Sequence, residues 1–324
     1  MNYRVMGRTN LRVSELCLGT MTFRWTSTEQ ESYEVMDAAF AAGINFFDTA
    51  DVYSRWAPNN HGGVAEEIIG KWLKMRAIPR DQIILATKVR GPMWQGADGE
   101  GLSRVHMMRA VEDSLRRMQI EYIDLYQSHW FDEATAQEET LRAYDDLVKQ
   151  GKVRFIGCSN FNAAHLRAAL DLSAQHKLVR YDTLQPHYNL IWRGEFENAL
   201  QALCAQENIG VIPYSPLGGG FLTGKYKRGE SIPANARGAN DERIQQWMQD
   251  ERVLSLLDTL QQVSAERGES MTVTALAWML TNAVVSSAII GANNVAQLNE
   301  SLAAAGKTLS ATEKQRLDAV SAWS

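Results

Sequence analysis

Eight short apolar runs, each followed by a longer segment of helical periodicity, constrain the fold of this chain of 324 residues. Each run is rich in β-branched or aromatic residues and has the length of a buried strand. Strand and helix alternating eight times in a chain of this length are typical of a parallel (β/α)₈ barrel. The expected strands are residues 15–21, 44–50, 83–89, 122–130, 153–160, 183–189, 209–217 and 286–292.

The segments between these runs carry helix signals. In residues 28–43, Thr28 can cap the first turn and Gly43 can end the helix. No Pro/Ser-rich linker or low-complexity tract divides the chain, so we expect a single domain over residues 1–324. Residues 4–14 are expected to form a short hairpin that covers the bottom of the barrel.

Charge and composition narrow the range of partners. The formal net charge is -5 and no block of Lys and Arg is present, which argues against a nucleic acid or an anionic membrane surface as partner. Small neutral or anionic molecules remain candidate ligands. Residues 270–299 carry no charged side chain, but polar residues interrupt them, so they predict a buried helix and a strand rather than a membrane span.

The three cysteines are far apart, odd in number and without CxxC spacing, which favours neither a disulfide framework nor a zinc site. The first ten residues lack the apolar core of a signal peptide. A reducing, cytoplasmic setting is the simpler interpretation.

Polar side chains follow three successive strands at the barrel end where such folds carry chemistry. Asp48 and Tyr53 follow the second strand, Lys88 ends the third, and His129 ends the fourth. Each alone has an ordinary structural explanation. Together, an acid, a phenol, an amine and an imidazole are expected to converge on one mouth, where Asp48 can pair with Lys88.

This combination suits proton transfer to a carbonyl. A protonated Lys88 favours the phenolate, so we expect it to lower the pKa of Tyr53 from its usual value of ~10 and to make it a general acid or base. His129 can donate a hydrogen bond to the carbonyl oxygen. We therefore predict a site that protonates a carbonyl as hydride arrives. Asp51, near this group, is interpreted as a capping or loop carboxylate.

Several motifs resemble the aldo-keto reductase superfamily, and bacterial members near the potassium-channel β-subunit branch in particular. They are GRTNLRVSELCLGTM, GINFFDTADVYS, ATKV, LYQSHWFD, IGCSNF, TLQPHYN and YSPLGGG, and they span nearly the whole chain. The resemblance implies a (β/α)₈ barrel that binds NADP(H) without a Rossmann domain. It also implies a catalytic tetrad, with Tyr53 as proton donor, made of Asp48, Tyr53, Lys88 and His129.

The resemblance further implies a set of cofactor contacts. The nicotinamide carboxamide would be bound by Ser159, Asn160 and Gln185, with Tyr214 stacked on the ring. The pyrophosphate would lie along Ser215, Leu217 and Gly219. The adenosine end would contact Gln297 and Glu300, and Gly291 and Asn293 would also belong to the cofactor site.

One position departs from many NADP-preferring members, which have an arginine where this chain has Asn293. The potassium-channel β-subunit branch uses a lysine and an arginine after the seventh strand instead, and Lys225 and Arg237 match them. An arginine suits the 2′-phosphate, so NADPH is the expected cofactor.

Aromatic residues suggest the character of the substrate pocket. Five tryptophans follow expected strands at the same barrel end, which predicts a partly apolar, aromatic-lined pocket with Trp25 and Trp130 as substrate contacts. The run GGFLTGKY lacks the Ser or Thr that a P-loop needs. No metal is expected, because no paired ligand spacing is found among His61, His106, His165, His176 and His187.

The leading hypothesis is an NADPH-dependent reductase that converts an aldehyde or ketone to an alcohol. One alternative is a lyase that uses Lys88 as a Schiff-base nucleophile, although Asp48 should keep that lysine protonated. The other is a redox-sensing subunit that binds cofactor without metabolic turnover, as the channel-associated relatives imply.

Overall fold

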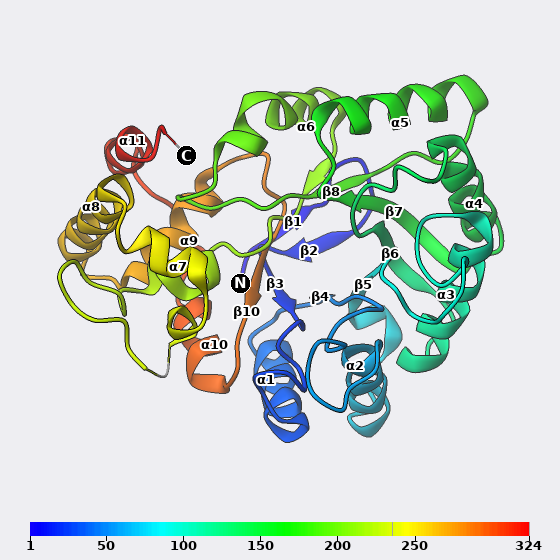
Figure 1. Cartoon of the computed structure of the whole chain (residues 1–324), viewed down its shortest axis with the longest axis horizontal. Coiled ribbons are helices and arrows are strands. Elements are labelled where there is room, and N and C mark those ends of the chain that lie inside the picture. Colours follow the sequence, from blue (N-terminus) through cyan, green and yellow to red (C-terminus); the bar gives the residue numbers. More distant parts are fainter. Residues whose placement is uncertain (235, 324) are drawn as a thin grey trace.

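The computed structural model describes residues 1–234 and 236–323, and within them it forms the expected (β/α)₈ barrel (Figure 1). Eight parallel strands pair in the order β10-β3-β4-β5-β6-β7-β8-β9. Isolated parallel bridges between Val211 and Val285 and between Tyr214 and Ile289 join the two ends of this sheet. The strands are β3 (Leu16–Gly19), β4 (Phe46–Asp48), β5 (Ile84–Val89), β6 (Ile123–Ser128), β7 (Val153–Ser159), β8 (Thr183–Gln185), β9 (Gly210–Val211) and β10 (Ala288–Gly291).

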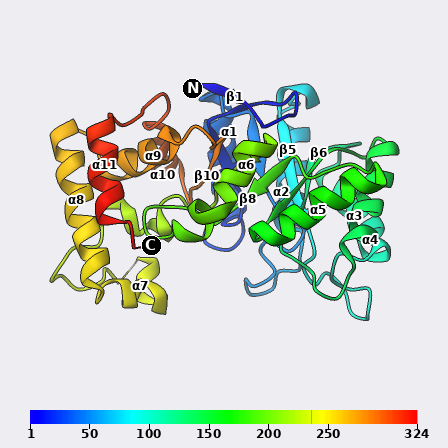
Figure 2. The same cartoon turned by 90° about the horizontal axis from the view of Figure 1, so that it is seen from above.

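Helices surround the strands, and α8 and α11 lie side by side on the outside of the barrel (Figures 1 and 2). Thr28 caps α1 in a reciprocal capping box with Glu31, and Gly43 follows the end of that helix at a φ of 88°, as predicted. The helices are α1 (Glu29–Ala41), α2 (Val64–Met75), α3 (Arg104–Met118), α4 (Gln137–Lys149), α5 (Ala163–His176), α6 (Gln201–Glu207), α7 (Glu242–Trp247), α8 (Glu251–Arg267), α9 (Met271–Thr281), α10 (Val295–Leu302) and α11 (Ala311–Val320). Short 3₁₀ turns lie at η1 (Arg80–Gln82), η3 (Gly218–Thr223) and η4 (Arg237–Ala239), and a π-helical turn lies at η2 (Phe196–Leu200).

Several strands are shorter than predicted. The runs 183–189 and 209–217 were expected as strands throughout, but β8 ends at Gln185 and β9 at Val211. Pro186 and Pro213 follow within two residues, and proline has no N–H to donate to a ladder.

Apolar side chains form two layers. One layer fills the barrel interior and the other lies between the strands and the helices. The predicted hairpin, β1 (Tyr3–Val5) paired with β2 (Arg12–Ser14), adds Met6 and Val13 to the interior layer. The barrel is thus filled below its mouth, as a packed core rather than a pore.

The hairpin approaches the strands closely. A Cβ on Gly7, whose φ is +55°, would lie 2.3 Å from the amide nitrogen of Gly210. Arg4 donates hydrogen bonds to the carbonyls of Leu280 and Val285. Only glycine fits this contact, which fixes the hairpin against the bottom of the barrel.

The three cysteines are buried, and the uncharged segment forms a buried helix and a mostly buried strand. Cys17, Cys158 and Cys204 are buried free thiols, and burial raises the pKa of each. Residues 270–299 contain α9 and β10, as predicted. Across residues 1–234 and 236–323, no helix combines the length and the apolarity needed to cross a membrane.

Candidate active site

Strand alternation directs three polar side chains into the barrel. Along β4, Phe46 lies in the interior layer and Phe47 in the outer one, so Asp48 points inward again. The same alternation along β5 and β6 turns Lys88 and Gln127 toward the axis. Lys88 and Gln127 are direct neighbours in the β5–β6 register.

Lys88 is the centre of a polar cluster. It is fully buried, and its Nζ donates to Asp48 Oδ1 at 2.5 Å, to the Thr49 carbonyl at 2.8 Å and to Tyr53 Oη at 3.0 Å. Burial alone would lower the pKa of Lys88, but Asp48 and Tyr53 outweigh it, and the pKa rises above its usual value. The lysine therefore remains an ammonium ion.

Tyr53 stands beside this ammonium on the turn that follows β4. Because Lys88 donates to Tyr53 Oη, the proton of the tyrosine points away from the lysine. Burial raises the pKa of Tyr53 and Asp48 adds to the rise, while Lys88 acts in the opposite direction. The predicted lowering of this pKa is wrong, because burial outweighs the ammonium. Tyr53 thus keeps its proton at neutral pH.

His129 lies next to Tyr53, with ring centroids 5.8 Å apart. Its backbone N–H donates to the Val89 carbonyl. Burial, the Lys88 ammonium and the Arg90 guanidinium all lower the pKa of His129 well below its usual value. The imidazole is therefore neutral, and within the described chain its Nδ1 is buried without a hydrogen-bond partner.

Two glutamines hold the remaining oxygen of Asp48. Gln127 and Gln185 each donate from Nε2 to Asp48 Oδ2, at 3.2 and 2.9 Å. Gln185 was expected only as a cofactor contact. Gln127 was missed, although it follows Leu125 by two residues and so shares its inward direction. Asp48 is thereby fixed toward Lys88 from both sides.

Asp51 lies in the turn that follows β4, as the loop interpretation predicts, but it is far more deeply buried than loop carboxylates usually are. Its side chain is fully buried, and among the described residues neither oxygen has a hydrogen-bond partner. Nearby, the buried Glu66 accepts from Arg117 at 2.6 Å and from Thr87 at 2.6 Å. Burial and the Glu66 charge raise the pKa of Asp51 well above its usual value.

This burial predicts a pH-dependent gain from Asp51→Asn. An acid whose pKa is higher when folded stabilises the protein below its unfolded pKa, about 3.9, and that contribution is lost as pH rises toward the folded pKa. Asparagine cannot ionise, so the variant should gain in unfolding free energy relative to wild type as pH rises from 4 to 7, by at most about 1.4 kcal/mol for each pH unit in that interval. Urea unfolding near pH 4 and at pH 7 measures the difference. Asp171→Asn, on the surface of α5, should show none, and an Asp51→Asn effect equal at both pH values would contradict the expectation.

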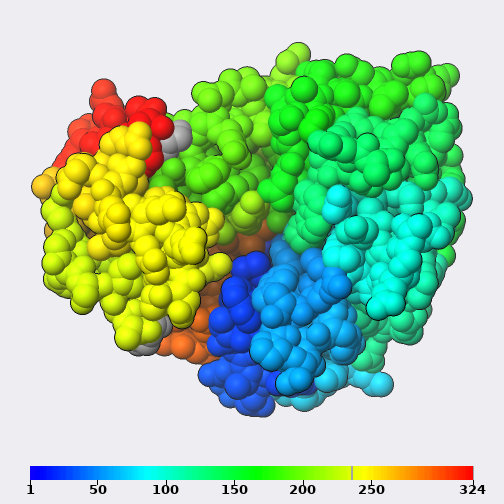
Figure 3. Space-filling view, in the orientation of Figure 1, coloured from blue at the N-terminus to red at the C-terminus, as the bar shows by residue number. Residues whose placement is uncertain are grey.

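A cavity of about 1680 Å³ opens above these side chains. The space-filling view shows the centre of this face hollowed between the yellow segment after β9 and the blue segments after β3 and β4 (Figure 3). Three of the four predicted catalytic side chains line the cavity, and Lys88 lies behind them. The predicted substrate residues Trp25 and Trp130 also line it, together with Trp56, which packs edge-on against Tyr53.

The cavity brings all of the predicted cofactor residues together. On its floor, Asn160 donates from Nδ2 to the His129 carbonyl at 3.0 Å and accepts at Oδ1 from Tyr214 at 2.8 Å. Ser159 donates to the Gln185 carbonyl. The predicted cofactor residues that line the cavity are Ser159, Asn160, Gln185, Tyr214, Ser215, Leu217, Gly219, Lys225, Arg237, Gly291, Asn293, Gln297 and Glu300.

Cationic groups also line this cavity. Arg237 is placed over the Trp25 ring at 5.6 Å and pairs with Asp241 at 3.4 Å. Burial and the nearby Arg237 lower the pKa of Lys225, while Glu300 opposes them. Asn293, in contrast, accepts a hydrogen bond from Thr26.

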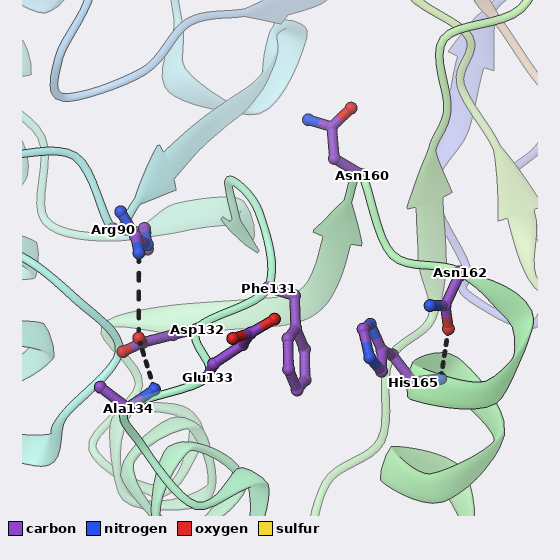
Figure 4. A pocket seen from close by; sticks show the side chains of 8 residues that line it. All are labelled: Arg90, Phe131, Asp132, Glu133, Ala134, Asn160, Asn162 and His165. Carbon is purple, nitrogen blue, oxygen red and sulfur yellow. Dashed lines mark hydrogen bonds and ion pairs between the residues drawn. The ribbon is translucent and has the colours of Figure 1, made fainter.

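A second cavity, of about 500 Å³, shares Asn160 with the first (Figure 4). In it Arg90 faces Asp132, and the Phe131 ring stacks on His165 with centroids 3.7 Å apart. The carboxylates of Asp132 and Glu133 outnumber the one guanidinium, which makes this cavity unsuited to an anion.

The fold and the mouth together define a barrel oxidoreductase, and comparison with known proteins agrees. The model of the Aldo/keto reductase family matches residues 15–322. The chain therefore belongs to the aldo/keto reductase family.

Three relatives illustrate this membership. An uncharacterized oxidoreductase, YrpG, of Bacillus subtilis (strain 168) is 37% identical over 311 residues, 94% of this chain and 91% of the relative. L-glyceraldehyde 3-phosphate reductase of Escherichia coli (strain K12) is 34% identical over 328 residues, 98% of this chain and 92% of the relative. A probable voltage-gated potassium channel subunit beta of Oryza sativa subsp. japonica is 33% identical over 309 residues, 94% and 91% of the two chains.

Proposed function

We propose that this protein is an NADPH-dependent reductase of aldehydes or ketones in which Tyr53 donates the proton. The observation that carries the proposal is the 3.0 Å contact between the Lys88 ammonium and Tyr53 Oη at the floor of the large cavity. Burial leaves the tyrosine protonated, while this contact turns its proton away from the lysine and puts a cation where the phenolate forms.

The side chains divide the work of protonation. Tyr53 gives its proton to the carbonyl oxygen as that oxygen gains negative charge. Lys88 stabilises the phenolate left behind, and Asp48 keeps Lys88 charged and in place. The neutral His129 donates from a ring N–H to the same oxygen and orients the substrate.

The residues present fit a nicotinamide dinucleotide, which supplies the hydride when bound. The cavity exceeds the range of about 300–1,000 Å³ usual for small-molecule sites, so it can hold a dinucleotide and a substrate together. Gly219 and Gly220 have φ values of 66° and 90°, and a Cβ on Gly220 would lie 2.7 Å from Lys225 Nζ. Backbone can therefore approach a pyrophosphate closely at this point.

Oxidation of NADPH and NADH, followed by absorbance with the purified protein, tests the proposal. The panel should include aromatic aldehydes, ketones, and L-glyceraldehyde 3-phosphate, the substrate named for the Escherichia coli relative. We expect turnover with NADPH and preference for substrates with an apolar group, because Trp25, Trp56 and Trp130 line the cavity. Failure to bind either cofactor would refute the proposal.

The cations Lys225 and Arg237 predict the basis of the NADPH preference. Lys225→Gln and Arg237→Gln should each weaken NADPH binding by about tenfold or more, the value of a lost charge-assisted contact to phosphate. NADH binding should change far less, since NADH has no 2′-phosphate. Cofactor titrations by fluorescence measure both. Arg228→Gln, paired with Glu251 and Asp258 outside the cavity, is the control. Equal weakening of NADPH and NADH binding would show that these cations do not contact the 2′-phosphate.

The same contacts and the same assays distinguish the two alternative functions. A Schiff-base lyase needs a neutral lysine, whereas Lys88 donates to three oxygens and has a raised pKa. A redox-sensing subunit is a candidate because of the rice relative. Tight NADPH binding without turnover of any carbonyl in the panel would favour that function.

A further inference from the structure

Tyr214 is one ring of a three-ring stack. Its neighbour His187 lies almost parallel to it, with centroids 5.0 Å apart and planes at 11°, an offset-stacked arrangement. Trp192 packs on His187 in turn, at 5.0 Å and 34°. Tyr214 lines the large cavity, whereas His187 and Trp192 do not. His187 therefore covers one face of the tyrosine ring and leaves the other to the cavity.

The backbone and a buried amide hold this stack. His187 and Tyr214 form a parallel bridge beyond the ends of β8 and β9, and the Tyr214 N–H donates to the Pro186 carbonyl. Asn189 is fully buried and donates to the Ser215 carbonyl at 3.0 Å, while its Oδ1 accepts from the Trp192 N–H. The position of the His187 ring relative to the Tyr214 ring is thus set by the backbone register as well as by the side-chain conformations.

The stack is coupled to the catalytic histidine and carries no charge. Tyr214 donates to Asn160, and Asn160 donates to the His129 carbonyl. Burial lowers the pKa of His187 to about 4, with Arg243 acting in the same direction. A neutral ring therefore backs Tyr214 at physiological pH, and it places no positive charge beneath an oxidised nicotinamide.

We propose that His187 is a positioning residue, which backs Tyr214 so that the tyrosine holds the nicotinamide at a fixed height relative to Tyr53 and His129. This role rests on the proposed function. His187 acts through Tyr214 and touches neither cofactor nor substrate. Its contribution is to limit movement of the platform, and small displacements of reacting atoms cost rate steeply.

Two substitutions separate the ring of His187 from its hydrogen-bonding atoms. His187→Gln keeps a polar side chain but removes the ring, and His187→Phe keeps a ring but removes the nitrogens. His165→Gln is the matched control, since His165 also stacks, on Phe131, away from Tyr214. For each variant, kcat, KM for NADPH, the isotope effect with 4-deuterated NADPH and the melting temperature are measured on the best carbonyl substrate.

We expect His187→Gln to lower kcat by about tenfold with a much smaller change in KM, because contacts to the adenosine end are untouched. The isotope effect on kcat should rise as hydride transfer becomes slower, which a loss of folded protein alone would not cause. His187→Phe should restore kcat to within about threefold of wild type, and the control should match wild type.

Three results would overturn the role of His187. They are wild-type kcat in His187→Gln, an unchanged isotope effect with reduced kcat, and a His187→Phe variant no faster than His187→Gln. In each of these cases normal turnover by the wild type leaves the proposed function standing. If the wild type itself neither binds NADPH nor reduces any carbonyl, the proposed function fails and the role of His187 fails with it.

Discussion

Replacing Tyr53 with phenylalanine is expected to lower kcat for carbonyl reduction by about 10²- to 10⁴-fold, the range typical of a lost general acid. Phenylalanine keeps the packing against Trp56 and the neighbouring His129 ring but has no proton to give. Affinity for NADPH should stay within about twofold, because the proposed cofactor contacts lie on other strands. Steady-state kinetics and cofactor titration on the same preparation measure both quantities.

The pH profile extends this expectation. Because the pKa of Tyr53 is raised, the proton donor is present at neutral pH and is lost only as pH rises through that pKa, above ~10. Reduction by the wild type should therefore show no fall due to this group between about pH 6 and pH 9. Tyr33→Phe, a tyrosine of α1 that bonds Glu29, serves as control. A near-normal kcat in Tyr53→Phe would show that Tyr53 is not the proton donor.

Lys88→Met should have the largest effect on stability. Lys88 is fully buried and Asp48 almost so, and removal of one partner of a buried ion pair costs about 3–5 kcal/mol. Among the described residues, the methionine leaves the Asp48 carboxylate with the two glutamine amides as its remaining donors. Urea unfolding should show the loss, and carbonyl reduction should fall as well, since the phenolate of Tyr53 would form without a neighbouring cation.

A second substitution distinguishes charge from packing. Asp48→Asn combined with Lys88→Met leaves no buried charge, so the double variant should be more stable than Lys88→Met alone. Lys71→Met removes an exposed pair with Glu29 and should cost at most about 1 kcal/mol. A Lys88→Met protein that unfolds at the wild-type urea concentration would show that the pair contributes little.

Much of the barrel follows from local pattern. The order of strands and helices is readable because buried strands and amphipathic helices differ in period and because caps such as Thr28 mark helix starts. Alternation along β5 also explains why Ile84, Ala86 and Lys88 share one direction, so a polar residue at the end of an apolar strand indicates the mouth. The same rule applied to β6 would have found Gln127.

The sequence does not show how deeply an individual side chain is buried. The sign of the Tyr53 pKa depends on how far burial outweighs one ammonium ion, and that balance is set by side chains from several strands. The burial of Asp51 could not be foreseen for the same reason, since nothing in DTADVYS shows that α2 and α3 close over it. The His187 stack depends on register between β8 and β9, which no local pattern encodes.

The three buried thiols have a practical consequence. Cys17, Cys158 and Cys204 are out of reach of solvent and are protonated at neutral pH, so an alkylating reagent or an oxidant reacts with them only when the chain opens. Each sits on a different element, β3, β7 or α6. The protein thus carries three built-in reporters of local opening, whose modification rates, resolved by mass spectrometry, would show whether the barrel opens as one unit or in sectors.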